Sequence, residues 1–94
     1  MLKIVTVCGN GIGSSLMLKM KIEEICSENG IKAVVESSDF NAAKGRQCDL
    51  IVTISELAAQ FDKSQRVAVT RSYINKKKIQ EDTLEILKEL NQQK

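Results

Sequence analysis

The chain has 94 residues, a net charge of +2, 43% hydrophobic residues and no histidine, proline or tryptophan. The length suits one domain spanning residues 1–94, and the small charge with only one Tyr and two Phe argues against nucleic-acid binding. No apolar run approaches the roughly 20 residues of a membrane span, and no secretory signal precedes the first strand, so we expect a cytoplasmic protein that does not itself span a membrane.

Hydrophobic patterning predicts strands that alternate with helices. The strands are expected over residues 2–7, 31–36, 49–54 and 66–70, and the helices over residues 15–29, 40–45 and 75–90, with a frayed polar tail at 91–94. Gly30 lies where glycine commonly caps the C-terminus of a helix. The alternation favours the α/β class, as a small open Rossmann-like sheet of four parallel strands in the order 2-1-3-4 with helices on both faces.

The chain carries a glycine-rich segment, Val7-Cys8-Gly9-Asn10-Gly11-Ile12-Gly13-Ser14-Ser15, between the first strand and the first helix. In the predicted sheet this segment lies where the strand order reverses, which is where open α/β sheets bind ligands. The glycines let backbone N–H groups turn toward an anion, and the helix adds the positive end of its dipole. The expected phosphate-binding residues are Gly9, Asn10, Gly11, Ile12, Gly13, Ser14 and Ser15.

The same positive field acts on the thiol of Cys8. Cysteines at helix N-termini have a lowered pKa, so Cys8 is expected to be largely thiolate near neutral pH. A thiolate directed at a bound phosphate is a nucleophile, and the product is a phosphocysteine held by the backbone N–H groups of the loop. Cys8 is therefore the predicted catalytic residue. Cys26 and Cys48 are expected to be packing or surface residues, and the three cysteines match no zinc spacing, so neither a metal nor a cofactor is expected.

Other phosphate-binding classes fit less well. A Walker loop needs a lysine before its last hydroxyl residue, and the dinucleotide fingerprint needs one more residue between its glycines. A low-molecular-weight tyrosine phosphatase shares the order of strand, cysteine, loop and helix, but it has an arginine where this chain has Ser14 and an Asp-Pro general acid, which a chain without proline lacks. Without that arginine a phosphocysteine should persist until an acceptor arrives, which favours a phosphoryl carrier. A thiol phosphatase or arsenate reductase, and a non-catalytic anion- or nucleotide-binding module, stay as alternatives.

Over essentially its whole length the chain resembles the cytoplasmic IIB (EIIB) components of the bacterial phosphoenolpyruvate-dependent sugar phosphotransferase system (PTS). The resemblance is most specific in Val7 to Ser15, and the continuation Leu16-Met17-Leu18-Lys19-Met20-Lys21 is similar to the ascorbate-specific branch; the galactitol and lactose branches are the alternative. The resemblance implies that Cys8 accepts a phosphoryl group from the phosphohistidine of a IIA component. It further implies transfer to ascorbate or a related carbohydrate bound by a membrane IIC component.

Several residues outside the loop allow two interpretations of their role. Thr53 and Ser55, at the end of the third strand, either hydrogen-bond the phosphoryl group or are ordinary turn hydroxyls. Arg71 and the run Lys76-Lys77-Lys78 either meet a partner or a phosphate, or are solvated surface charge. Met17 and Met20 either form an adaptable docking surface for IIA or IIC, or belong to the core.

Overall fold

The computed structural model describes residues 2–7, 12–44, 47–61, 65–71 and 75–93. Four parallel strands form one sheet in the order β2-β1-β3-β4, as the sequence predicts. The strands are β1 (Leu2–Val7), β2 (Ala33–Ser38), β3 (Leu50–Thr53) and β4 (Val67–Val69). The helices are α1 (Ile12–Glu28), α2 (Phe40–Lys44), α3 (Ser55–Ala58) and α4 (Lys76–Gln93).

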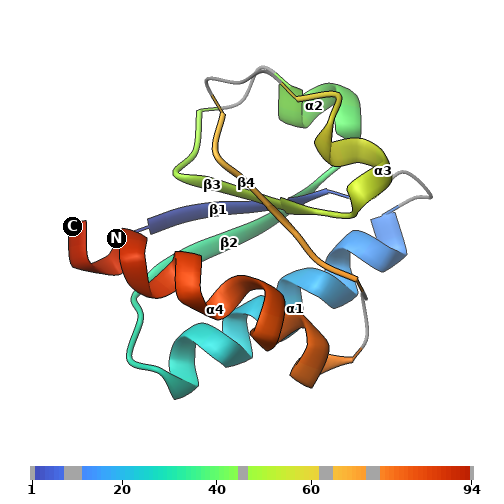
Figure 1. The fold of residues 1–94 in the computed structure, drawn as a ribbon. Helices are drawn as coiled ribbons and strands as arrows, with labels where there is room; N and C mark the ends of the chain where they lie inside the picture. Colours follow the sequence, from blue (N-terminus) through green and yellow to red (C-terminus); the bar gives the residue numbers. More distant parts are fainter. Residues whose placement is uncertain (1, 8–11, 45–46, 62–64, 72–74, 94) are drawn as a thin grey trace.

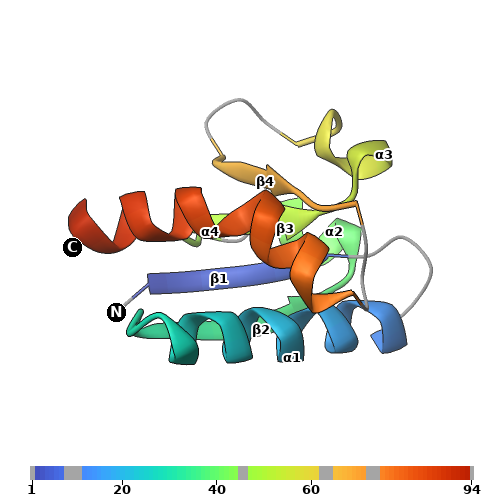
Figure 2. The same cartoon turned by 60° about the horizontal axis from the view of Figure 1, so that its bottom comes forward.

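The helices form a layer on each side of the sheet. The two long helices, α1 and α4, cover one face, and the short helices α2 and α3 lie on the other (Figures 1 and 2). Among the described residues, no helix combines the length and the apolar character that crossing a membrane requires.

Two hydrophobic clusters, one on each face, fill the space between these layers. On the first face, alternate residues of β1 and β3 such as Ile4 and Val52 pack against Ile22 of α1 and Leu87 of α4. The neighbouring positions of the same strands point the opposite way, because side chains alternate along a strand. On the second face the cluster consists of Val5, Val7, Ile51, Ala43 and Phe61. β1 and β3 are therefore buried on both sides, which explains their nearly continuous apolar sequence.

Gly30 ends α1 in a Schellman motif, as its position predicts. Its φ is +69°, the N–H of Ile31 donates to the carbonyl of Cys26 at 2.8 Å, and the N–H of Gly30 donates to the carbonyl of Ser27 at 3.4 Å. Because Ile31 belongs to this cap, β2 begins at Ala33, two residues later than the sequence predicts.

Three further features differ from the expectation by three residues or more. α1 begins at Ile12, so Gly13 and Ser14 belong to its first turn. The helix α3 is not expected from the sequence, since four residues are too few for a periodic pattern to show. α4 continues through Gln93, three residues beyond its expected end at residue 90, where the sequence has no glycine or proline to stop it.

The cap yields a stability prediction. Gly30→Ala lowers the free energy of unfolding by about 1 kcal/mol, because an alanine pays a steric cost at positive φ that glycine does not. An added Cβ would meet no atom within 4 Å, so the loss reports the backbone conformation alone. Urea denaturation measures it, and Gly30→Asn, which tolerates this conformation better, is the matched variant. A stabilised alanine variant would contradict the cap assignment.

Candidate functional site

The candidate site lies at the carboxyl ends of β1 and β3. β1 pairs with β2 on one side and with β3 on the other, so the chain leaves β1 toward one edge and later returns to its opposite side. Crevices at such a reversal are the usual ligand sites of open α/β sheets. Val7 ends β1 and Ile12 begins α1, so the glycine-rich segment connects the end of a central strand to the N-terminus of a helix of 17 residues.

The predicted site residues divide into two groups. Cys8, Gly9, Asn10 and Gly11 lie outside the described residues. Ile12, Gly13, Ser14 and Ser15 form the first turn of α1, of which the backbone is described. This turn contains no acidic residue, so no carboxylate competes there for the positive end of the helix dipole. The N-terminus of α1 therefore has the electrostatic character that an anion site needs, and the individual roles of these residues stay predictions.

Thr53 connects the two central strands, β3 and β1, at their carboxyl ends. Its side chain is fully buried, its hydroxyl donates to the carbonyl of Val7 at 3.0 Å, and its own carbonyl accepts the N–H of Thr70 at 2.8 Å. The bonded carbonyl belongs to the residue directly before Cys8. Thr53 thus fixes the point from which the loop departs, while contact with a phosphoryl group stays a prediction. Ser55 is the first residue of α3, two positions beyond.

This bond is a feature that the sequence does not reveal. Thr53 is recognisable as a hydroxyl at a strand end, but its partner depends on the register between β1 and β3, in which Thr6 lies opposite Val52. Only that register brings the end of β3 next to Val7, 46 positions away in the chain.

Thr53→Val tests this positioning role. Removal of the hydroxyl leaves a buried carbonyl with one partner fewer, so we expect the free energy of unfolding to fall by about 1–2 kcal/mol. Thr83→Val is the matched control, since the buried hydroxyl of Thr83 donates to the carbonyl of Ile79 within α4 at 2.7 Å. Both variants should lose stability in urea titrations, but only Thr53→Val should change the alkylation rate of Cys8. An equal Cys8 rate in the two variants would contradict the role.

Ion pairs involve two of the four basic residues Arg71, Lys76, Lys77 and Lys78. Arg71 contacts Glu81 and Asp82, each at 3.1 Å, and its backbone N–H donates to Asp82 at 2.9 Å. Partial burial alone would raise the pKa of Asp82, but the hydrogen bonds and charge of Arg71 outweigh it and hold that pKa below its usual value. The guanidinium is therefore already matched by carboxylates.

Lys76 makes its pairs at the far end of α1. Its ammonium group contacts Glu28 and, at 3.7 Å, Glu24. These glutamates lie 12 and 16 residues beyond Ile12, which is about 18–24 Å along the helix at 1.5 Å per residue. The observed pairs of Arg71 and Lys76 favour the surface-charge reading of these two residues. Lys77 and Lys78 are exposed near the start of α4.

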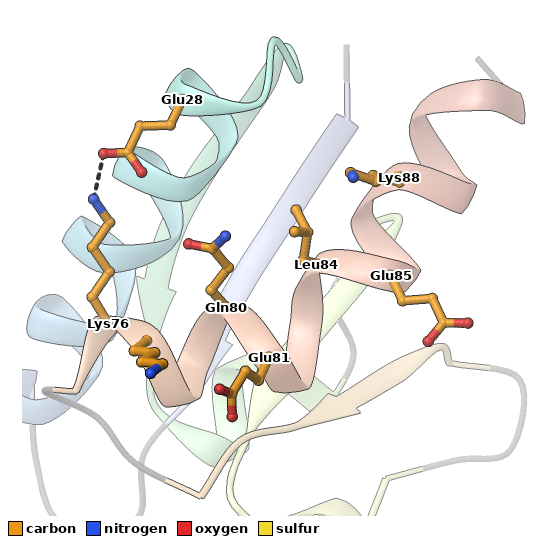
Figure 3. A pocket seen from close by; sticks show the side chains of 8 residues that line it. Glu28, Lys76, Gln80, Glu81, Leu84, Glu85 and Lys88 are labelled. Atoms are coloured by element: carbon orange, nitrogen blue, oxygen red, sulfur yellow. Dashed lines mark hydrogen bonds and ion pairs between the residues drawn. The ribbon is translucent and has the colours of Figure 1, made fainter.

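A hollow of about 840 Å³ follows the outer side of α4 (Figure 3). Figure 3 shows Lys76 reaching Glu28 at one end, with Gln80 and Leu84 further along α4. The described lining residues come from α4 and the last turn of α1: Glu28, Lys76, Lys77, Gln80, Glu81, Leu84, Glu85 and Lys88. None of these lies at the carboxyl ends of β1 and β3, and the lining contains three lysines and three glutamates. The hollow is therefore separate from the carboxyl ends of β1 and β3, and its lining lacks the single positive sign of a phosphate site.

Exposed apolar side chains follow the loop on α1. Leu16 is 44%, Met17 45% and Met20 54% exposed, whereas Leu18 between them is fully buried. Met17 and Met20 are thus surface residues, and the core reading of these two methionines is wrong. Apolar side chains gathered beside a candidate site mark an interaction surface more often than isolated ones do.

The family model described as "PTS system, Lactose/Cellobiose specific IIB subunit" matches residues 3–89. The chain belongs to this family of PTS IIB subunits. Among its relatives is the "Ascorbate-specific PTS system EIIB component" of Mycoplasma pneumoniae, 33% identical over 70 residues, which are 72% of this chain and 74% of that protein. The component of the same name from Salmonella typhimurium is 28% identical over 91 residues, 93% of this chain and 90% of that protein.

Solved structures agree on the fold. The lactose-specific IIB component domain of the phosphotransferase system from Streptococcus pneumoniae superimposes with a TM-score of 0.60, covering 93% of this chain and 95% of that one at 18% identity. The resemblance stated from the cysteine loop is therefore confirmed, and so is the open sheet with the order 2-1-3-4. Membership of the EIIB family makes the chain part of a sugar phosphotransferase system and implies IIA and IIC partners.

Cys26 and Cys48 of this IIB subunit are buried to different degrees. Cys26 is buried in α1, where burial and then the charge of Glu23 raise its pKa to about 11. Its thiol is therefore neutral and unreactive near pH 7. Cys48 is half-buried and packs against the second cluster. Within the described ranges, no three His, Cys, Asp or Glu side chains come together as a metal-binding group.

Proposed function

We propose that this IIB subunit is a cytoplasmic phosphoryl carrier whose covalent intermediate forms on Cys8. The thiolate attacks the phosphorus of a IIA phosphohistidine, the N–P bond breaks as the S–P bond forms, and the imidazole leaves and regains a proton. A sugar hydroxyl held by IIC then attacks the same phosphorus. The S–P bond breaks, the thiolate returns, and the hydroxyl proton passes to a base at the acceptor site.

One observation carries the proposal: the cysteine-containing segment joins the end of β1 to the N-terminus of α1. A helix start combines oriented N–H groups with the positive end of the dipole, which favours both the thiolate and the transferred phosphoryl group. The first turn of α1 holds no carboxylate, and the fold ties the carbonyl before Cys8 through Thr53. These features favour electrostatic stabilisation of charge on the phosphoryl oxygens.

Ascorbate, or a related carbohydrate, is the proposed acceptor. The relatives from Mycoplasma pneumoniae and Salmonella typhimurium carry ascorbate-specific names, and the match to the first covers most of both chains. The family model and the solved structure carry lactose-type names, so a lactose- or galactitol-type sugar is the alternative that a transport assay separates.

Intact-mass spectrometry tests the site. After incubation with phosphoenolpyruvate, the two general proteins of the system and a IIA component, the chain should gain one phosphoryl group. Cys8→Ala should gain none, because no nucleophile stands at the loop, while Cys26→Ser and Cys48→Ser should be labelled like the parent. An adduct that survives Cys8→Ala would contradict the assignment. Hydrolysis of p-nitrophenyl phosphate without an adduct would support a phosphatase instead.

We further propose that Leu16, Met17 and Met20 form the IIA docking surface. They lie within the first three turns of α1, directly after the loop, so a donor that reaches Cys8 must pass close to them. Methionine side chains adapt to a partner's shape, which suits transient docking.

A charge introduced on this surface should weaken the encounter without affecting the fold. Met17→Asp is expected to raise the KM for phosphorylated IIA about tenfold, the size of one lost interface anchor, with kcat and the denaturation midpoint nearly unchanged. Asn91→Asp is the control, since it introduces the same charge at an exposed residue near the end of α4, outside this surface. Steady-state transfer assays measure both. Equal KM values for parent and Met17→Asp would remove this residue from the docking surface.

A further inference from the structure

β2 is an edge strand that leaves one side open. It has six residues and, among the described residues, pairs only with β1. The opposite edge is formed by β4, which has three residues. An edge strand presents a row of backbone N–H and C=O groups to any further strand, and a longer edge presents more of them.

The register shows which backbone groups point outward. The N–H of Leu2 donates to the carbonyl of Lys32 at 3.1 Å, and Leu2 lies opposite Ala33. Backbone groups of alternate residues point to the same side of a strand, so positions 32, 34 and 36 direct theirs toward β1. The N–H and C=O groups of positions 33, 35 and 37 are therefore directed to the open side.

The side chains along this edge place opposite charges on either side of one apolar residue. Lys32, Val34 and Glu36 alternate onto one face and all three are exposed, Val34 to 44%. Val35 points to the other face, where it is buried in the cluster beneath α1. One exposed apolar residue thus stands midway between a cation and an anion, each two positions away.

We propose that β2 pairs antiparallel with β2 of a second copy of this chain, with the two-fold axis at Val34. Ala33 of each copy then exchanges backbone hydrogen bonds with Val35 of the other, as their outward groups require. The two Val34 side chains meet as a non-hydrogen-bonded pair, and the result is one continuous sheet across both copies.

Charge complementarity selects this register. Lys32 of each copy lies opposite Glu36 of the other, so the contact forms twice, and opposite charges in cross-strand pairs stabilise a sheet. A two-fold axis at Glu36 would instead place two carboxylates face to face. Antiparallel pairing also directs the carboxyl ends of the two sheets in opposite directions, so the carboxyl ends of β1 and β3 stay accessible to partners in both copies.

Charge reversal tests the register by sedimentation velocity over a concentration series. Lys32→Glu alone and Glu36→Lys alone each create two like-charged pairs, so each should raise the dimer dissociation constant about tenfold. The double variant restores both pairs with reversed polarity and should return the constant to within about threefold of the parent. Lys88→Glu, on the exposed side of α4, is the control that should have no effect.

Cross-linking gives a second readout in a chain with Cys8→Ser and Cys48→Ser. Val34→Cys should oxidise to a disulfide-linked dimer, because non-hydrogen-bonded pairs bring Cα atoms to about 4.5 Å, within disulfide range. Ala33→Cys should not, since its opposite residue is Val35. A parent chain that is monomeric at millimolar concentration, a dimer that survives both single reversals, or a double variant without rescue would overturn the proposal. None of these outcomes depends on the proposed function of Cys8.

Discussion

The burial of both faces of β1 and β3 is the constraint on which the rest of the structure depends. Ile4 and Val52 face α1 and α4, and Val5 and Ile51 face the other layer, each with at most 2% exposure. Such strands require helices on both sides, so every connection must cross the sheet as a right-handed parallel crossover. That crossing pattern gathers the carboxyl ends of β1 and β3 and the start of α1 at one edge (Figure 2).

The electrostatics at this edge follow from the backbone more than from charged side chains. Arg71 and Lys76 are engaged by carboxylates of α4 and α1, and the first turn of α1 is free of acidic residues. In the proposed mechanism the phosphoryl group is therefore held by N–H groups and the helix dipole. Such a site binds charge without the bidentate arginine that promotes attack by water, which is the property a carrier needs.

Several elements could be predicted from their apolar residues. The strands β1 and β3, the helices α1 and α4, the Gly30 cap and the strand order all follow from apolar spacing and from the rules for parallel sheets. Boundaries were less predictable, because they depend on hydrogen bonds: the Ile31 cap delays β2, and Asn91 to Gln93 extend α4 although they are polar.

The chemistry of the candidate site could be predicted from the sequence, but the long-range contacts around it could not. The spacing of Cys8 and the glycines is local information that the sequence displays. The bond from Thr53 to Val7 and the pairing of Lys76 with Glu28 join positions 46 and 48 residues apart, so they depend on packing that no local pattern encodes. Exposure of Met17 and Met20 likewise depends on how α1 is rotated over the sheet, which the weak amphipathic pattern of this helix leaves open.

The fate of the phosphoryl group tests the central claim most directly. The chain would be phosphorylated by a IIA component that carries a radioactive phosphoryl group, and then separated from that donor. One half would be kept in buffer alone, and the other half would be mixed with vesicles that contain the IIC component and ascorbate. The account predicts that the label stays on the protein in buffer and moves to the carbohydrate in the presence of the vesicles. Equally rapid release as inorganic phosphate in both samples would show a phosphatase and contradict the carrier.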